Sequence, residues 1–184
     1  MEKTAVIYSS VYGSTKQYAQ WLAEALDCGC LEAKDVSPEG LREYDTLLFG
    51  GGLYAGGLTV APVVKRCLPL LRGRRIAVFT VGIADPDSPE NRLHIRTELQ
   101  RTFTSEELAA FRLFHLRGAL DYSRMGLKHR AMMAMLKTVL QRRKPAERSA
   151  EDQQLLDTYG GSVSFLDRDS LGPLEAFARG GEEF

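Results

Sequence analysis

Long apolar runs are missing from this sequence of 184 residues, since no stretch approaches the ~18 apolar residues of a transmembrane helix. An acid, Glu2, and only a short apolar run follow the first residue, so we expect no signal peptide. A net charge of one sign is missing too, because 24 Lys and Arg residues balance 24 Asp and Glu residues. This balance disfavours a uniformly basic nucleic-acid binder. We therefore expect a cytoplasmic protein without a nucleic-acid partner.

Cysteine is scarce, with only Cys28, Cys30 and Cys67 in the sequence. An odd number of cysteines without a secretory signal indicates reduced thiols. Cys28 and Cys30 form a C-x-C pattern without a second pair, and the three histidines are scattered, so we predict no metal site. His115 falls inside a predicted strand, where we expect a structural histidine rather than a base.

The composition that is present is ordinary for a globular protein, with 44% hydrophobic and 26% charged residues. The length predicts one domain over residues 1–184. Short β-rich runs alternate with segments of helical periodicity, which predicts βαβ units, a parallel sheet and helices on both of its faces. The expected strands are residues 4–9, 31–36, 46–50, 75–82 and 112–116, and the expected helices are residues 14–26, 60–71, 89–101, 105–110 and 170–179.

The region 122–160 departs from this alternation, and we predict a helical insertion there. Its main helix, residues 125–143, is rich in bases and carries an apolar stripe at helical spacing. The stripe is interpreted as core packing, as an adaptable partner surface, or as the apolar face of a basic helix on an anionic membrane surface. The last interpretation places the protein peripherally at the inner face of a membrane. The stripe comprises Met125, Met132, Leu136 and Val139, and the bases are Arg124, Lys128, Arg130, Lys137, Arg142, Arg143, Lys144 and Arg148.

The first predicted strand runs directly into a turn rich in hydroxyl groups, and a helix begins there. Free N–H groups and the helix dipole make a helix N-terminus favourable for an anion. Ser10, Ser14 and Thr15 each carry a hydroxyl that can donate a hydrogen bond. The turn contains no Lys or Arg, which suits a fixed monophosphate better than a reacting triphosphate. A serine-capped helix without a ligand is the simpler alternative.

Other phosphate-binding motifs are absent from the sequence. Without G-x-x-x-x-G-K-S/T, a P-loop NTPase is excluded. Without G-x-G-x-x-G after the first strand, the dinucleotide fingerprint is excluded. A phospho-acceptor receiver domain needs acids after the first strand and an Asp at the end of the third, where this sequence has Ser9, Ser10 and Gly50.

The third predicted strand ends in a glycine-rich segment, with five glycines over residues 50–57. Glycines let a backbone approach a flat ligand closely, and Tyr54 in this segment is able to stack on one. In a doubly wound sheet the ligand crevice lies at the carboxyl ends of the first and third strands, where both unusual segments fall. A flexible glycine-rich turn with an exposed tyrosine is the alternative interpretation.

The turn from Ser10 to Thr15 resembles the phosphate loop of flavodoxins, Ser/Thr-x-x-Gly-Asn/Ser-Thr. The resemblance covers roughly residues 1–120 and the last helix. It implies a flavodoxin-like three-layer α/β sandwich, a five-stranded parallel sheet in the order 2-1-3-4-5 and non-covalent FMN as cofactor. The third loop, after residue 82, lacks the aromatic residue that often covers one face of the flavin ring. By position, the resemblance implies that Ser10, Val11, Tyr12, Gly13, Ser14 and Thr15 hold the phosphate and that Gly51, Gly52, Leu53, Tyr54, Ala55, Gly56, Val81, Gly82, Ile83 and Asp85 contact the ring.

Two features depart from electron-carrier flavodoxins, which are usually strongly acidic. The sequence is neutral, and its glycine-rich segment carries no acid. The second departure is the basic, methionine-rich helix 125–143, which looks similar to the extra segment of the menaquinone-dependent protoporphyrinogen oxidase-like branch. The stretch from Gly118 to Arg124, which leads into that helix, resembles the Gly-Ala-Leu-x-Tyr stretch of the same branch. This similarity implies an FMN-binding oxidoreductase that transfers electrons or hydride to or from a small organic substrate, such as a quinone or a porphyrinogen. An electron carrier that docks on redox partner proteins is the alternative, and no catalytic residue is predicted.

Overall fold

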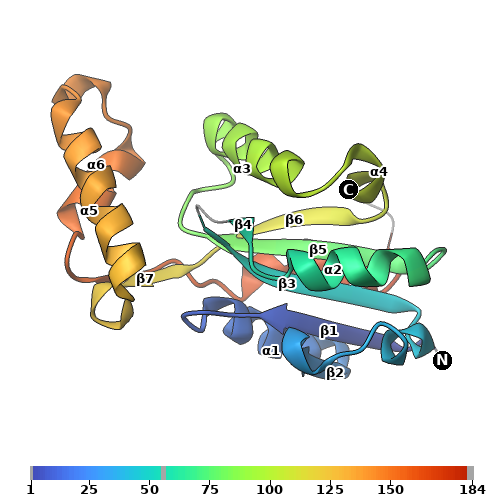
Figure 1. The fold of residues 1–184 in the computed structure, drawn as a ribbon. Coiled ribbons are helices and arrows are strands. Elements are labelled where there is room, and N and C mark those ends of the chain that lie inside the picture. Colours follow the sequence, from blue (N-terminus) through green and yellow to red (C-terminus); the bar gives the residue numbers. More distant parts are fainter. Residues whose placement is uncertain (1, 55–56, 182–184) are drawn as a thin grey trace.

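The centre of the fold is a parallel sheet, seen in a computed structural model that describes residues 2–54 and 57–181 (Figure 1). Its strands lie in the order β2-β1-β3-β5-β6, and β4 pairs antiparallel with the end of β3. Counted along the chain, the parallel strands have the predicted order 2-1-3-4-5. The strands of this sheet are β1 (Thr4–Ser9), β2 (Gly29–Glu32), β3 (Thr46–Tyr54), β4 (Gly57–Leu58), β5 (Arg75–Gly82) and β6 (Arg112–Arg117).

Helices cover both faces of the sheet because side chains of the central strands alternate between two apolar clusters. In β1, Ile7 packs with residues of α2 and α3, whereas Val6 packs with residues of α1 and α7. Figure 1 shows the resulting three layers, with the sheet between two layers of helices. The helices of these layers are α1 (Ser14–Leu26), α2 (Ala61–Cys67), α3 (Pro89–Thr102), α4 (Ser105–Ala109) and α7 (Gly172–Ala178).

The glycine-rich segment is mostly strand, so the prediction that the third strand ends at residue 50 is wrong. β3 continues to Tyr54, and its glycines pair with β5 through Gly52. Gly50 is needed for packing, since a Cβ atom there would stand 2.1 Å from the ring of the buried Phe79. The glycine at this position therefore admits an aromatic ring between strand and helix layers, rather than forming a flexible turn.

Two other predicted boundaries are wrong for simpler reasons. The second strand was expected over residues 31–36, but β2 ends at Glu32, because its partner β1 ends one residue after their last pair. The helix expected over residues 60–71 becomes a 3₁₀ turn after Cys67. Pro69 explains this change, because proline disfavours the α conformation in the preceding residue and lacks an N–H donor.

Residues 119–164 form a lobe beyond the carboxyl ends of the parallel strands, where we predicted a helical insertion over 122–160 (Figure 1). A short antiparallel pair, which the sequence did not predict as a separate sheet, connects the lobe to the body. Arg148, between the two helices of the lobe, donates to the Leu140 carbonyl of the first helix at 3.0 Å and to Gln153 Oε1 of the second at 3.4 Å, which ties the two helices together. The elements of the lobe are β7 (Ala119–Asp121), α5 (Leu127–Arg142), α6 (Ala150–Asp157) and β8 (Ser162–Ser164).

The apolar stripe of helix 125–143 is not core for most of its length, so that alternative is wrong. Within α5, which the structure describes throughout, only Leu140 is fully buried. Leu136 and Val139 are exposed, as are the neighbouring Leu127 and Met135, with exposed fractions of 86% and 68%. None of the helices formed by residues 2–54 and 57–181 is both long and apolar enough to cross a bilayer.

Candidate functional site at the carboxyl end of the sheet

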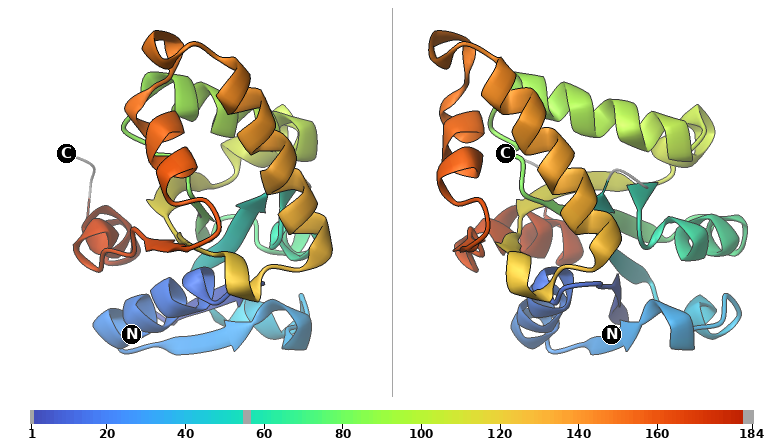
Figure 2. Two further views of the ribbon diagram at one scale, coloured as in Figure 1. Left: turned by 90° about the vertical axis from the view of Figure 1, so that its left-hand side faces the viewer. Right: turned by 60° about the vertical axis from the view of Figure 1, so that its left-hand side comes forward.

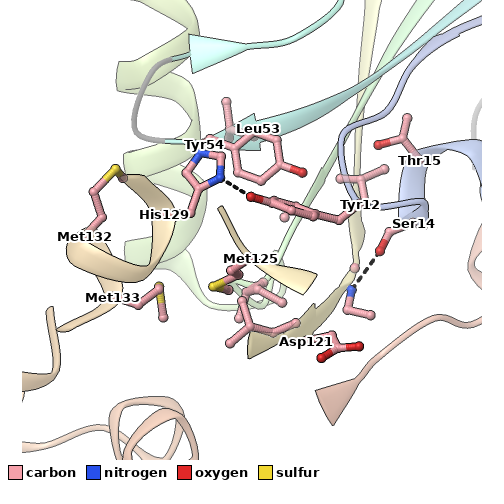
Figure 3. Close-up of a pocket in the computed structure, with 16 residues that line it drawn as sticks. Tyr12, Ser14, Thr15, Leu53, Tyr54, Asp121, Met125, His129, Met132 and Met133 are labelled. Carbon is pink, nitrogen blue, oxygen red and sulfur yellow. Dashed lines mark hydrogen bonds between the residues drawn. The ribbon is translucent and has the colours of Figure 1, made fainter. Parts of the chain in front are cut away.

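A cavity of about 200 Å³ lies where the carboxyl ends of the parallel strands meet α5. In both views of Figure 2, α5 crosses this end of the sheet. Figure 3 shows the side chains around the cavity. The crevice predicted at the ends of the first and third strands is therefore present. Of the predicted site residues, those that line the cavity are Tyr12, Ser14, Thr15, Leu53, Tyr54, Val81, Gly82 and Ile83.

Gly118 and the lobe supply the other half of the cavity wall, which was not assigned to the site from the sequence. In α5, Met132 follows His129 by three residues and Met133 follows it by four. Side chains at these spacings are neighbours on a helix. The methionine stripe and this histidine share one helix face, and that spacing was the available signal. The wall residues missed from the sequence are Gly118, Ala119, Leu120, Asp121, Met125, His129, Met132 and Met133.

Several predicted ring contacts do not line the cavity. Gly51 and Gly52 are buried inside β3, and a Cβ atom on Gly52 would stand 2.6 Å from the Tyr54 ring. Gly52 thus lets the Tyr54 ring fold back over the strand and reach the cavity. Asp85, another predicted ring contact, lies outside the cavity wall, as do Ser10, Val11 and Gly13, which were predicted to hold the phosphate. Ala55 and Gly56 lie outside the described residues.

The turn before α1 leaves the start of that helix open to an anion. Gly13 is the N-cap residue with φ of 100°, a conformation that favours glycine, and no side-chain cap is formed there. The alternative of a serine-capped helix is therefore wrong for this part of the chain. Ser10 Oγ instead accepts the Gly13 N–H at 3.0 Å, and Ser14 Oγ accepts the Ala119 N–H at 3.1 Å. With no acid in its first turn, α1 keeps its N–H groups and positive dipole end available.

The third loop, after β5, is held by Arg117 at the end of β6. The Arg117 Nε donates to the Ile83 carbonyl at 3.3 Å, and its guanidinium lies 3.7 Å from the Asp85 carboxylate. Asp85 also accepts the Asp87 N–H at 2.9 Å. These bonds engage the Asp85 carboxylate outside the cavity wall, which explains why Asp85 does not line the cavity.

Three aromatic rings from three separate elements meet at the outer wall of the cavity (Figure 3). Tyr54 and His129 are stacked, with ring centroids 5.1 Å apart and planes 21° apart, and Tyr12 meets both rings edge-on. The Tyr12 hydroxyl shares a hydrogen bond with Nδ1 of His129 and accepts the Gly126 N–H at 3.3 Å. Burial, together with the nearby Tyr12, raises the pKa of Tyr54 to about 12, so its phenol is neutral at physiological pH.

His115 lies in β6 and has a structural partner, because its Nδ1 is 2.9 Å from Thr80 Oγ1. Burial lowers the pKa of His115 and favours the neutral imidazole. This arrangement agrees with the expected structural role.

A family model described as a flavodoxin domain matches residues 5–146 of the sequence. The chain belongs to the flavodoxin-domain family. This membership supports FMN as the cofactor of the protein. A search of curated proteins returned no match to the sequence.

Solved structures similar to this flavodoxin-domain protein have low identity to it. The two-electron reduced Megasphaera elsdenii flavodoxin is 16% identical, with 61% of this chain and 82% of that chain covered and a TM-score of 0.43. Flavodoxin 2 from Bacillus cereus is 17% identical, with coverages of 84% and 93% and a TM-score of 0.41. A Lactobacillus acidophilus flavoprotein in complex with FMN is 16% identical, with coverages of 64% and 93% and a TM-score of 0.41. The family assignment rests on the sequence match and not on these likenesses.

Proposed function

We propose that this flavodoxin-domain protein is an FMN-dependent oxidoreductase acting on a small organic substrate. The observation that carries the proposal is the enclosure of the cavity by α5, whose His129, Met132 and Met133 form its outer wall. An electron carrier needs a flavin edge that reaches a partner protein. An apolar cavity under a helix instead suits a small planar molecule.

The described residues offer FMN two adjoining places, one for its phosphate and one for its ring. We propose that its phosphate binds at the open start of α1, by the amides of Val11 and Tyr12 and by the hydroxyls of Ser10, Ser14 and Thr15. The Gly13 amide, which the resemblance also implied, already donates to Ser10 Oγ. Ser10 and Ser14 accept backbone N–H groups, which leaves their own hydroxyl hydrogens to donate to a phosphate. The ring then binds in the adjoining cavity near Tyr54. When bound, FMN supplies the redox chemistry, and the protein supplies position and electrostatics. The remaining proposed contacts are Leu53, Val81, Gly82 and Ile83.

A quinone or a porphyrinogen is the substrate class that we propose. The stretch similar to the protoporphyrinogen oxidase-like branch supports this class, because its residues 118–121 line the cavity. The methionines of the outer wall give a soft, apolar surface that adapts to a flat molecule. Arg124 lines a second depression that shares Ala119 to Asp121 with the cavity wall, and it offers a cation to acidic groups of a substrate.

The exposed side of α5 also supports a peripheral contact with an anionic membrane. Its apolar residues Leu127 and Met135 stand in solvent, and Lys128 and Arg142 on the same helix are exposed bases. A lipid-soluble substrate such as a quinone would reach the cavity from that surface. The same surface favours the second candidate function, an electron carrier that docks on a redox partner protein.

A redox titration of the FMN-loaded protein separates the two functions. A carrier that passes single electrons stabilises the flavin semiquinone over a wide range of potential. We expect instead that the spectrum changes from oxidised to fully reduced flavin in a single two-electron step. A semiquinone that dominates the titration, combined with no turnover of quinones or porphyrinogens, would assign the protein to the carriers.

A further inference from the structure

We propose that His129 is the proton-transfer residue of this cavity, giving a proton to the bound substrate or taking one from it, and that Tyr12 positions it. The proposal rests on the oxidoreductase function proposed above. Neither residue's side chain was assigned this role by the sequence, in which the three histidines are merely scattered.

The chemistry has a place for such a residue. Reduction of a quinone to a hydroquinone consumes two electrons and two protons. Bound FMN would supply both electrons together with one proton, as a hydride equivalent. The second proton goes to the other oxygen of the quinone, and a side chain in the cavity wall is placed to donate it. When the substrate is instead the hydrogen donor, the same side chain accepts the proton that remains after loss of the hydride equivalent.

The other titratable groups of the cavity wall are poor candidates. Burial holds Tyr54 in its neutral form, with its pKa raised to about 12. The Ser123 hydroxyl donates to the Asp121 carboxylate at 2.6 Å and lowers the pKa of Asp121, so that this group stays ionised near neutral pH. Tyr12 is engaged with His129 and Gly126. His129 is the remaining wall residue of a type that gains and loses a proton near neutral pH.

The contacts of His129 define which ring nitrogen is available. The Tyr12 hydroxyl oxygen has two lone pairs, and it accepts Nδ1–H of His129 as well as the Gly126 N–H at 3.3 Å. In the neutral ring the proton then sits on Nδ1, so the Nε2 lone pair is left to take a proton from the substrate, and the protonated ring gives that proton back from Nε2. The stacked face of Tyr54 also tolerates the protonated ring, because a cation is attracted to the face of an aromatic system.

The position of His129 on α5 separates its role from cofactor binding. The phosphate is proposed to bind at the start of α1, whereas His129 belongs to the lobe and meets the body through Tyr12 and Tyr54. Loss of the imidazole should therefore change proton transfer while the protein still takes up FMN. Tyr12 acts through its hydroxyl, since its ring contacts persist in a phenylalanine.

The test uses FMN-loaded protein that has been reduced anaerobically and mixed with either of two oxidants. The quinone probe, 2-methyl-1,4-naphthoquinone, takes up protons with its electrons, whereas ferricyanide takes up electrons alone. In the wild-type protein, the reaction with the quinone should slow as the pH rises. His129→Asn keeps a group that pairs with Tyr12 but cannot pass a proton to the substrate. It should react with the quinone about 100-fold more slowly near pH 6 and without that pH dependence, while the ferricyanide rate stays unchanged.

His94→Asn is the matched control, because His94 is exposed on α3, and it should behave as the wild type. Imidazole nitrogen NMR gives a readout independent of turnover. The Nδ1–H form should dominate in the neutral wild type, and Tyr12→Phe should shift His129 to a mixture of tautomers. The proposal is overturned if His129→Asn keeps the wild-type rate and pH profile with the quinone, or loses the ferricyanide reaction to the same extent. A wild-type protein that reacts with ferricyanide but with no quinone would instead overturn the proposed function.

Discussion

The Ser14 hydroxyl oxygen accepts a hydrogen bond from the amide of Ala119, which lies 105 residues later in the chain. This bond joins the turn at the start of α1 to the first strand of the inserted lobe. A Cβ atom on Gly118, the preceding residue, would stand only 3.0 Å from Val81, so the chain passes close to the end of β5 here. The proposed phosphate site and the cavity wall are therefore parts of one hydrogen-bonded unit.

Ser14→Ala should weaken FMN binding about tenfold. The variant removes a hydroxyl donor to the charged phosphate, a loss of about 1.5 kcal/mol. The Ala119 N–H loses its partner in the free and the FMN-bound variant alike, so that loss lowers stability rather than affinity. Isothermal titration of flavin-free protein with FMN measures the effect. Ser37→Ala is the matched control, because it also removes one side-chain bond to a backbone N–H, that of Gly40, and neither residue lines the cavity. Equal affinities of the two variants would contradict the assignment.

Gly50→Ala should destabilise the protein by about 3 kcal/mol, because its methyl group would overlap the buried ring of Phe79. Gly29→Ala serves as the control, since a Cβ atom there meets no heavy atom within 4 Å. Urea unfolding followed by circular dichroism gives both free energies of unfolding. If both variants unfold at the same urea concentration, Gly50 is not held by packing against Phe79.

Tyr54 should make stability decline at high pH. Its pKa is about 12 in the folded protein, whereas an unfolded tyrosine ionises near pH 10. Between these values the unfolded chain loses a proton that the folded chain keeps, so the free energy of unfolding decreases as the pH rises through this window. Below pH 10, the contribution of Tyr54 to the free energy of unfolding does not change with pH. Tyr54→Phe should flatten this part of the stability profile and remove one late-titrating tyrosine from the absorbance at 295 nm, and an unchanged profile would argue against a buried phenol.

Replacing Leu127 and Met135 by serine should reduce binding to anionic vesicles more than tenfold, since each exposed side chain contributes about 1.5–3 kcal/mol when it enters an apolar phase. Co-sedimentation with vesicles of phosphatidylglycerol and phosphatidylcholine measures this binding. Added salt should weaken it, because the bases of α5 attract the headgroups. Leu93→Ser, an exposed apolar residue on α3, is the control. If the wild-type protein stays in the supernatant when the vesicles are sedimented, the proposed membrane contact is wrong.

The sequence predicts the layered fold well where local signals agree. The bounds of α1 and β5 are those expected, because a regular hydrophobic pattern is bounded by clear turn residues in both cases. β3 was predicted too short because consecutive glycines are typical of turns, whereas here they admit the Phe79 ring. That requirement comes from a neighbouring strand and leaves no signal in the segment itself.

About half of the residues that line the cavity were named as site residues from the sequence. The residues contributed by the strand ends follow from the topology, since the carboxyl ends of parallel strands lie together. The wall formed by the lobe depends on contacts between distant segments, such as that of Tyr12 with His129 across 117 residues. The spacing of apolar residues in α5 is the same whether they face a core, a cavity or solvent, so sequence periodicity does not separate these cases.

The account depends most on the claim that small organic substrates react inside the cavity under α5. Met133 lines that cavity, whereas Met135, two residues later on the same helix, is 68% exposed. The decisive measurement is the rate at which reduced, FMN-loaded Met133→Trp and Met135→Trp variants reduce 2-methyl-1,4-naphthoquinone, with ferricyanide as the reference oxidant. The account predicts at least a tenfold loss of the quinone reaction in Met133→Trp alone, with the ferricyanide rate retained in both. Equal quinone rates in the two variants would contradict it.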